Sequence, residues 1–139
     1  MTVRSVGARI VAYVAGACLV AITVAITVAL PPEIRDGFTV GQVATLVVML
    51  LATLAVLFGI ARSMVHTDVD GVHVLNGYRR YHVPWSEIRG IGFGRGSPWA
   101  TLVLFDERTI MMLAIQGSDG QRARDAVSQM RRDLATNQR

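Results

Sequence analysis

Two long apolar segments without a charged residue constrain this chain more than any other feature of its sequence. The first, residues 10–30, is 21 residues long, and the second, residues 37–61, is followed directly by Arg62. A helix needs about 20 apolar residues to cross the hydrocarbon core of a bilayer, which is about 30 Å thick. We therefore predict two transmembrane helices, about 10–30 and 43–61, joined by a short loop at 31–42 that opens with two prolines.

A cleaved signal peptide is an alternative interpretation of the first apolar segment. Arg4 and Arg9 form a positively charged region in front of it, as in a signal peptide. The segment is longer than the about 7 to 15 apolar residues usual in signal peptides, so we favour a helix that stays in the protein.

Small residues recur every four positions in both segments: Ala17, Ala21, Ala25 and Ala29 in the first, Ala55 and Gly59 in the second. In lipid, such spacing lets helix backbones approach closely. We expect these residues to hold the two helices against each other, and dimerisation is the alternative. Neither segment contains an ionisable Asp, Glu, Lys, Arg or His. Such residues mark ion and proton pathways in membranes, so their absence argues against a transporter or channel.

The rest of the chain, residues 62–139, has the charge of a small, mildly basic domain. It holds eleven Arg against eight acidic residues, and the whole chain has a formal net charge of +4. This balance is too weak for a nucleic-acid-binding arm, so we expect no nucleic-acid partner. The single cysteine, Cys18, lies in the first apolar segment, where we interpret it as a small apolar side chain in lipid.

A β-hairpin is predicted at the centre of this domain. Asn76-Gly77 is a pair typical of a two-residue type I′ turn, because both residues tolerate positive φ angles. That turn sets Leu75 opposite Tyr78 and Val72 opposite Tyr81. Side chains alternate between the two faces of a strand. The face expected in the core therefore holds Val72, Val74, Tyr81 and Val83, and the other face holds His73, Arg80 and His82.

The remaining elements follow from turn residues and periodicity. Other strands are predicted at 62–67, 88–96, 99–105 and 109–115, and Gly90, Gly92 and Gly94 in one of them indicate a bent or edge strand, or a face open to another backbone. The spacing Ser118-x-x-Gln121 predicts a capping box before an amphipathic helix at about 119–135. Trp85, after Pro84, offers a large apolar surface to fill a corner of the core. The predicted structural core comprises Val72, Val74, Tyr81, Val83, Trp85, Ile88, Met130 and Leu134.

The run DGVHVLNGYRRYHVPWSEIRGI, followed by a second hairpin and a terminal helix, resembles the bacterial PH-like (pleckstrin-homology-like) domains of small actinobacterial two-helix membrane proteins. The resemblance covers residues 62–134 and is most specific at VPWSEI. It implies a PH-like antiparallel β-barrel of 6–7 strands closed by a C-terminal helix, although only six strands are evident. We predict a membrane α-helical hairpin, residues 1–61, followed by this small α+β domain, residues 62–139.

Two departures from the family pattern concern the ligand. Phosphoinositide-binding PH domains resemble one another in a basic cluster in the first loop between strands, whereas this chain has Asp68-Val69-Asp70-Gly71 there. The resemblance also implies a Trp in the closing helix of eukaryotic PH domains, and residues 119–135 contain none. The first departure argues against recognition of inositol lipids.

No catalytic or metal-binding constellation stands out in the sequence. His66, His73 and His82 lack metal-ligand spacing on a single element, and we interpret them as solvated strand histidines. We predict that the protein is not an enzyme and has no cofactor and no metal site. Candidate contacts to an anionic membrane surface are Arg62, Arg79 and Arg80, and a solvated rim of the barrel is the other interpretation of these arginines.

These features predict a membrane-anchored binding or scaffolding module at the inner face of the cell membrane, with the lipid bilayer and a protein or peptide as partners. The alternative is an accessory of a cell-envelope enzyme that binds a lipid or an envelope intermediate. Arg4, Arg9 and Arg62 flank the predicted helices on one side, and only Arg35 lies in the loop between them. The positive-inside rule then predicts a cytoplasmic N-terminus and a cytoplasmic C-terminal domain.

Overall fold

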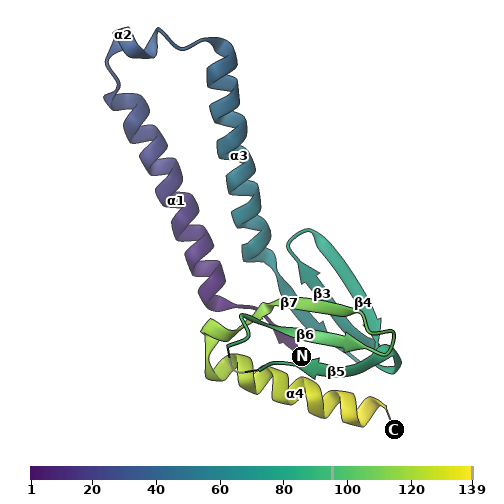
Figure 1. The fold of residues 1–139 in the computed structure, drawn as a ribbon. Helices are drawn as coiled ribbons and strands as arrows, with labels where there is room; N and C mark the ends of the chain where they lie inside the picture. The colour runs from purple at the N-terminus through teal and green to yellow at the C-terminus, as the bar shows by residue number, and fades with distance from the viewer. Residues whose placement is uncertain (95, 139) are drawn as a thin grey trace.

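The computed structural model describes residues 1–94 and 96–138, which form a helical hairpin standing on a small β-rich domain. Helix α1 (Val6–Ala29) and helix α3 (Val40–Arg62) run antiparallel and are joined at the far end by the short helix α2 (Pro32–Arg35). Both ends of the chain lie in the domain at the other end of the hairpin (Figure 1).

The two long helices have the length and surface of membrane spans. With 24 and 23 residues they are each about 35 Å long at 1.5 Å per residue, enough for the hydrocarbon core. Their apolar side chains are mostly exposed within the chain, as suits helices in contact with lipid. The Ser5 side chain caps α1, and Thr39 and Gln42 form a capping box at the start of α3. The protein is therefore a membrane protein.

A strand missing from the prediction comes from before the first membrane helix. Strand β1 (Thr2–Val3) pairs antiparallel with β2 (Met64–Thr67), with Thr2 opposite His66 and Val3 opposite Val65. Thr67 also donates its backbone N–H to the Met1 carbonyl at 2.8 Å. The six predicted strands thus become seven, and the added one is too short to show an alternating pattern in the sequence.

The seven strands form two antiparallel sheets in the described residues and do not close into one barrel. The first sheet has the order β1-β2-β3-β4, with β3 (Gly71–Asn76) and β4 (Arg79–Pro84) as a hairpin. The second sheet has the order β5-β6-β7. Its strands are β5 (Ile88–Gly92), β6 (Trp99–Leu104) and β7 (Thr109–Gln116). This is the PH-like sandwich of strands with a C-terminal helix, α4 (Gln121–Asn137).

The predicted register of the β3–β4 hairpin is wrong by two residues. Asn76 pairs with Arg79, so the loop is Gly77-Tyr78, and Gly77 takes the positive φ of 62°. Glycine first in the loop is the type II′ arrangement. Val72 therefore lies opposite Val83 and Val74 opposite Tyr81. A slip of two residues preserves which face each side chain occupies, so the same residues face the core as in the predicted register.

Asn76 is drawn into β3 because its side chain joins the two sheets. Its Nδ2 donates to the Met111 carbonyl at 2.6 Å, and its Oδ1 accepts from the Leu113 N–H at 3.1 Å. The amide thus hydrogen-bonds the free edge of β7 as a neighbouring strand would. A turn position, as predicted for this residue, would not allow that contact.

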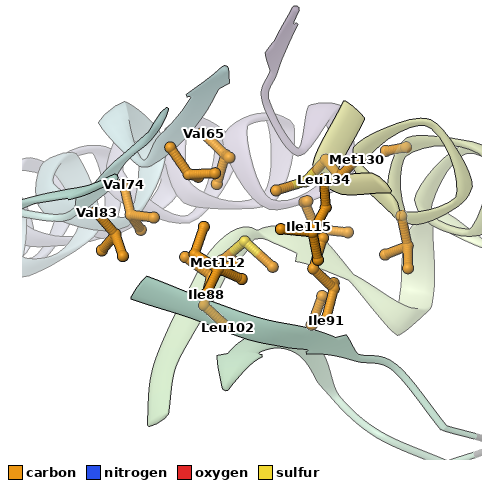
Figure 2. Packing of buried hydrophobic residues seen from close by; sticks show 14 of the residues in the cluster. Val65, Val74, Val83, Ile88, Ile91, Leu102, Met112, Ile115, Met130 and Leu134 are labelled. Atoms are coloured by element: carbon orange, nitrogen blue, oxygen red, sulfur yellow. The ribbon is translucent and has the colours of Figure 1, made fainter. Parts of the chain in front are cut away.

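The hydrophobic core lies between the two sheets and α4, as Figure 2 shows. Seven of the eight residues predicted for it are buried, and Tyr81 is half-buried at its margin. Trp85 is 4% exposed, lies in the short helix η1 (Trp85–Glu87), and donates its Nε1–H to the Asp68 carbonyl at 2.9 Å. The sequence did not single out the fully buried Val65, Leu102, Met112 and Ile115.

Helix α4 closes the sandwich over the edge of β5. Gly120 stands at its N-cap without a side-chain hydrogen bond, and Ser118 bonds Gln116 instead, so the predicted capping box is absent. Arg131 donates to the Ile91 carbonyl at 2.8 Å. Gln138 donates to the carbonyls of both Trp85 and Ile88. These side chains cover carbonyl groups that an edge strand would otherwise expose.

We expect Trp85→Ala to destabilise the full chain by about 3 to 5 kcal/mol, because it removes a buried indole and leaves a cavity. Chemical unfolding in detergent micelles, followed by near-UV circular dichroism, measures this. The exposed His82 is the control, and His82→Ala should change stability by no more than about 0.5 kcal/mol. Equal effects of the two substitutions would contradict the assignment of Trp85 to the core. The full chain is needed because a fragment starting at Arg62 lacks β1.

Candidate functional site

The tip of the β3–β4 hairpin, Gly77 and Tyr78, is docked on membrane helix α3. The Tyr78 hydroxyl donates to the Ala55 carbonyl at 2.6 Å. The ring lies over Gly59, where an added Cβ would come within 2.9 Å of the Tyr78 Cε2 atom. Only glycine leaves room for the aromatic ring so close to the helix backbone. We call this contact the hairpin dock.

Ser63 joins the same tip to the end of the helix. Its hydroxyl oxygen accepts from the Gly77 N–H at 3.0 Å, and the hydroxyl donates to the Gly59 carbonyl at 3.3 Å. Ser63 is 4% exposed and is the single residue between α3 and β2. The domain therefore follows the membrane helix without a flexible linker.

The hairpin dock changes the role expected for Ala55 and Gly59. We predicted that they would pack against the first helix, but both contact Tyr78. On α1, Gly16 lies close to α3, since an added Cβ there would be 3.5 Å from Leu54. The spacing of small residues predicted a close approach to the helix backbone but not which element makes it.

The three arginines predicted to meet an anionic surface lie near the hairpin dock. The Arg62 guanidinium is 5.5 Å from the centre of the Tyr78 ring and 5.8 Å from that of Phe58. These are cation–π distances. Arg79 and Arg80 follow the tip at the start of β4 and are both exposed. Tyr78 thus packs against membrane helix α3, and the three arginines lie near the end of that helix.

The depth of this contact follows from helix geometry. Ala55 precedes Arg62, the last residue of α3, by seven positions, or about 10 Å along the axis. A hydrocarbon core that ends near Arg62 therefore places the Tyr78 hydroxyl about 10 Å inside its edge. A tyrosine hydroxyl in an apolar environment needs a hydrogen-bond partner, and the Ala55 carbonyl provides it.

Three histidines form a row across the outer face of the first sheet. His66 pairs with His73, and His73 pairs with His82. The rings of His73 and His82 are stacked with centroids 4.3 Å apart, and those of His66 and His73 are 6.0 Å apart. The predicted register sets His73 opposite Arg80 and so does not bring the three histidines together. We call His66, His73 and His82 the histidine row.

Asp68 lies at one side of the histidine row. Its Oδ2 is 2.8 Å from Nε2 of His73 and 3.9 Å from Nε2 of His66. Partial burial raises the pKa of the Asp68 carboxyl, but the backbone N–H groups of Gly71 and Asp70 and the neighbouring His73 together lower it below its ordinary value. Asp68 thus stays ionised beside the row. No group of three or more His, Cys, Asp or Glu side chains in the described residues is arranged to hold a metal ion.

The glycines of β5 do not form one open face. An added Cβ at Gly90 would meet nothing, whereas at Gly92 it would lie 2.7 Å from the Thr101 hydroxyl oxygen. β5 is a strand at the edge of its sheet, with a shift in register between Ile88 and Gly90. It ends at Gly92, and Arg95, in the stretch predicted to continue it, lies outside the described residues.

We expect Gly59→Val to release the hairpin tip from α3, because a branched side chain would overlap the Tyr78 ring. Tyr78→Phe should have a smaller effect of about 0.5 to 1.5 kcal/mol, since it removes one hydrogen bond. Both substitutions should speed hydrogen exchange of the Gly77 amide, which can be measured in lipid nanodiscs. Tyr13→Phe, at an exposed tyrosine of α1, is the matched control and should leave this amide protected. Full protection of Gly77 in Gly59→Val would disprove the dock.

Comparison with known proteins agrees with this architecture. Three similar proteins, two from strains of Mycobacterium tuberculosis and one from Mycobacterium bovis, are uncharacterised and are each 37% identical over 87 residues. The match covers 63% of this chain and 55% of each relative, so the chain spans about half the length of these relatives. No solved structure matches. Residues 62–133, the part with β2 to β7 and most of α4, match the bacterial PH domain family, and the chain belongs to that family.

Proposed function

We propose that the protein is a membrane-anchored binding module, not an enzyme, whose PH-like domain lies against the cytoplasmic leaflet and holds a protein partner there. The hairpin dock carries this proposal. A domain joined to its span by one buried serine and by the Tyr78–Ala55 hydrogen bond keeps a fixed orientation to the membrane. Fixed presentation of one surface at the bilayer is what a scaffold requires, and PH-like domains as a class are generally non-catalytic.

Arg62, Arg79 and Arg80 set this orientation in our proposal. Arg62 is the last residue of α3, and Arg79 and Arg80 follow the hairpin tip that docks on this helix. We place all three inside the Debye length of about 8 Å at physiological salt. Each Arg that reaches an anionic surface contributes about 1 kcal/mol. With the hairpin tip directed at the leaflet, the second sheet and α4 are free to face the cytoplasm.

Strand β4 offers the partner a place to bind. In the described part of the chain it pairs with β3 on one side and with no strand on the other. An extended peptide can add to such an edge through main-chain hydrogen bonds. Arg79, Arg80 and His82 on this strand would favour a peptide with acidic side chains and discourage non-specific pairing.

The alternative, a lipid-binding accessory of an envelope enzyme, draws on a groove between the membrane helices. The groove has a volume of about 510 Å³ and is lined by apolar and small side chains of α1 and α3, with Tyr13 and Phe58 among them. An acyl chain would fit this chemistry. It is the less favoured function, because the groove opens to the bilayer and ordinary lipids would fill it as well.

The proposed topology has both termini in the cytoplasm and residues 31–37 outside. The pairing of β1 with β2 supports it, because the segments before α1 and after α3 must then lie on one side of the membrane. A reporter enzyme that is active only after export, fused after the C-terminal residue, should therefore be silent, whereas the same reporter inserted at Gly37 should be active. Activity of the C-terminal fusion would show that the topology is the opposite of the proposed one.

Crosslinking in native membranes tests the binding role. A photoreactive amino acid in place of Arg80, on β4, should give a protein adduct of defined size. The same amino acid in place of Ser128, on the exposed side of α4, is the control and should not give that adduct. No adduct from β4, together with a specific lipid identified by mass spectrometry of the purified chain, would favour the alternative function.

A further inference from the structure

Strand pairing brings several basic side chains together on the outer face of the first sheet. The histidine row crosses β2, β3 and β4 at one level, and the Thr2 hydroxyl on β1 lies 2.8 Å from Nδ1 of His66. The side chains of His66 and His73 are each about two-fifths exposed, and His82 is exposed. Ring nitrogens along this row are therefore accessible from outside.

Charged groups from the neighbouring strands face the same surface. Arg4 follows β1, and its guanidinium is 3.6 Å from the Met64 sulfur on β2. Arg80 on β4 lies opposite Leu75 of β3, on the same face as the row. Asp68 is the acidic side chain within 4 Å of the row. The face thus has one net positive charge with neutral imidazoles and four when all three are protonated.

Protonation of the histidine row would make this face attract anions. Histidine is the side chain best suited to gain and lose charge near neutral pH. Imidazolium rings stacked 4.3 Å apart repel each other, and one carboxylate cannot neutralise three of them. External anions between the row and the arginines at its two ends would stabilise the charged form.

We propose that this face, the histidine row with Arg4 and Arg80, binds the phosphate groups of anionic lipids in the leaflet that anchors the protein, and that it does so when the imidazoles are protonated. The inference rests on the proposed function, because the face must lie at the leaflet surface. It adds a proton-dependent contact to the permanent contact of the hairpin tip.

The position of the face favours lipid phosphates as the ligand. Strand β2 begins one residue after α3 ends, and His66 is two residues further, about 7 Å along the strand. The row is therefore close to the headgroup layer. Arg80, on the same face, extends this basic surface toward the hairpin tip. Arg4 stands on the opposite side of the row, before the start of α1, at the same end of the helical hairpin.

Imidazole NMR of the full chain in nanodiscs tests the proposal. The row should bind protons more tightly in discs of phosphatidylcholine mixed equally with phosphatidylglycerol than in discs of phosphatidylcholine alone. A negative surface potential of about −30 to −50 mV does this to any nearby group, so a reference histidine is needed. We choose Glu33→His, an exposed position in α2 at the far end of the helical hairpin and so at the other face of the disc, and expect the row to gain at least about threefold more proton affinity than this reference.

Variants and salt separate direct contact from the general field. Arg4→Gln with Arg80→Gln should remove most of the excess over the reference, whereas Arg132→Gln, at an exposed arginine of α4, should leave it. At about 1 M salt, where the Debye length is about 3 Å, the excess should vanish. An effect on the row no larger than on the reference histidine would overturn the proposal. If the double variant fails to fold, the wild-type row and the reference histidine decide the comparison.

Failure of this inference can be distinguished from failure of the proposed function. Magnetisation transfer between the Tyr78 ring and lipid protons reports the tip at the leaflet independently of the row, when it is measured at a pH above the imidazole transitions that the NMR titration shows. Transfer at that pH without an excess for the row would refute the lipid-binding face and leave the docked module. Absence of transfer would refute both.

Discussion

One carbonyl group of a membrane helix, that of Ala55, anchors the hairpin tip of the domain. The Ala55 oxygen belongs to the helical ladder, in which its partner is the N–H of Gly59 four residues on. A carbonyl oxygen has two lone pairs, so it also accepts from the Tyr78 hydroxyl at 2.6 Å without breaking the helix. Gly59 then has two roles, since its N–H continues the helix and its missing side chain makes room for the ring. Because water is scarce inside the hydrocarbon, this bond has few competitors.

The domain is attached to the membrane helices at three places. α3 continues into β2 through Ser63, β1 continues into α1 through Arg4 and Ser5, and the hairpin tip binds the side of α3. Ser5 and Ser63 are 3% and 4% exposed, so both connections are part of the packed structure. The β1–β2 pairing also closes a loop that contains both helices. The helical hairpin and the first sheet are therefore one structural unit, although the sequence divides into an apolar and a polar part after residue 61.

Features that arise from long local patterns in the sequence were predictable, and features that arise from contacts between distant residues were not. Long charge-free segments predicted the membrane helices, and alternating Val residues with Trp85 predicted the core faces, because a register error of two residues leaves the faces unchanged. The register itself was not predicted correctly, because Asn76 lies in β3, where its side chain hydrogen-bonds β7, and not in the turn. A turn propensity cannot anticipate a partner 35 residues away. β1 was missed because two residues carry no periodicity.

The candidate site was harder to predict than the fold for the same reason. Arg62, Arg79 and Arg80 could be named from sequence, but Tyr78 was assigned only as a strand residue and Gly59 as a helix-packing residue. The histidine row required the correct pairing of three strands, and one wrong hairpin register separated His73 from His82. Contacts between elements far apart in sequence decide these sites, and local patterns constrain them weakly.

The strand edges show where a partner can still act. α4 covers the β5 edge through Arg131 and Gln138, and the Asn76 amide occupies the β7 edge. β1 is two residues long and stands at the foot of α1. Among the described strands, β4 thus keeps the longest edge without a hydrogen-bonded neighbour. It starts at the hairpin tip and bears both Arg80 and His82, so a peptide that adds to it would lie beside the face proposed for lipid phosphates. Binding of a peptide and of lipid would then be coupled through charge, since an acidic peptide on β4 would compete with lipid for the same cationic groups.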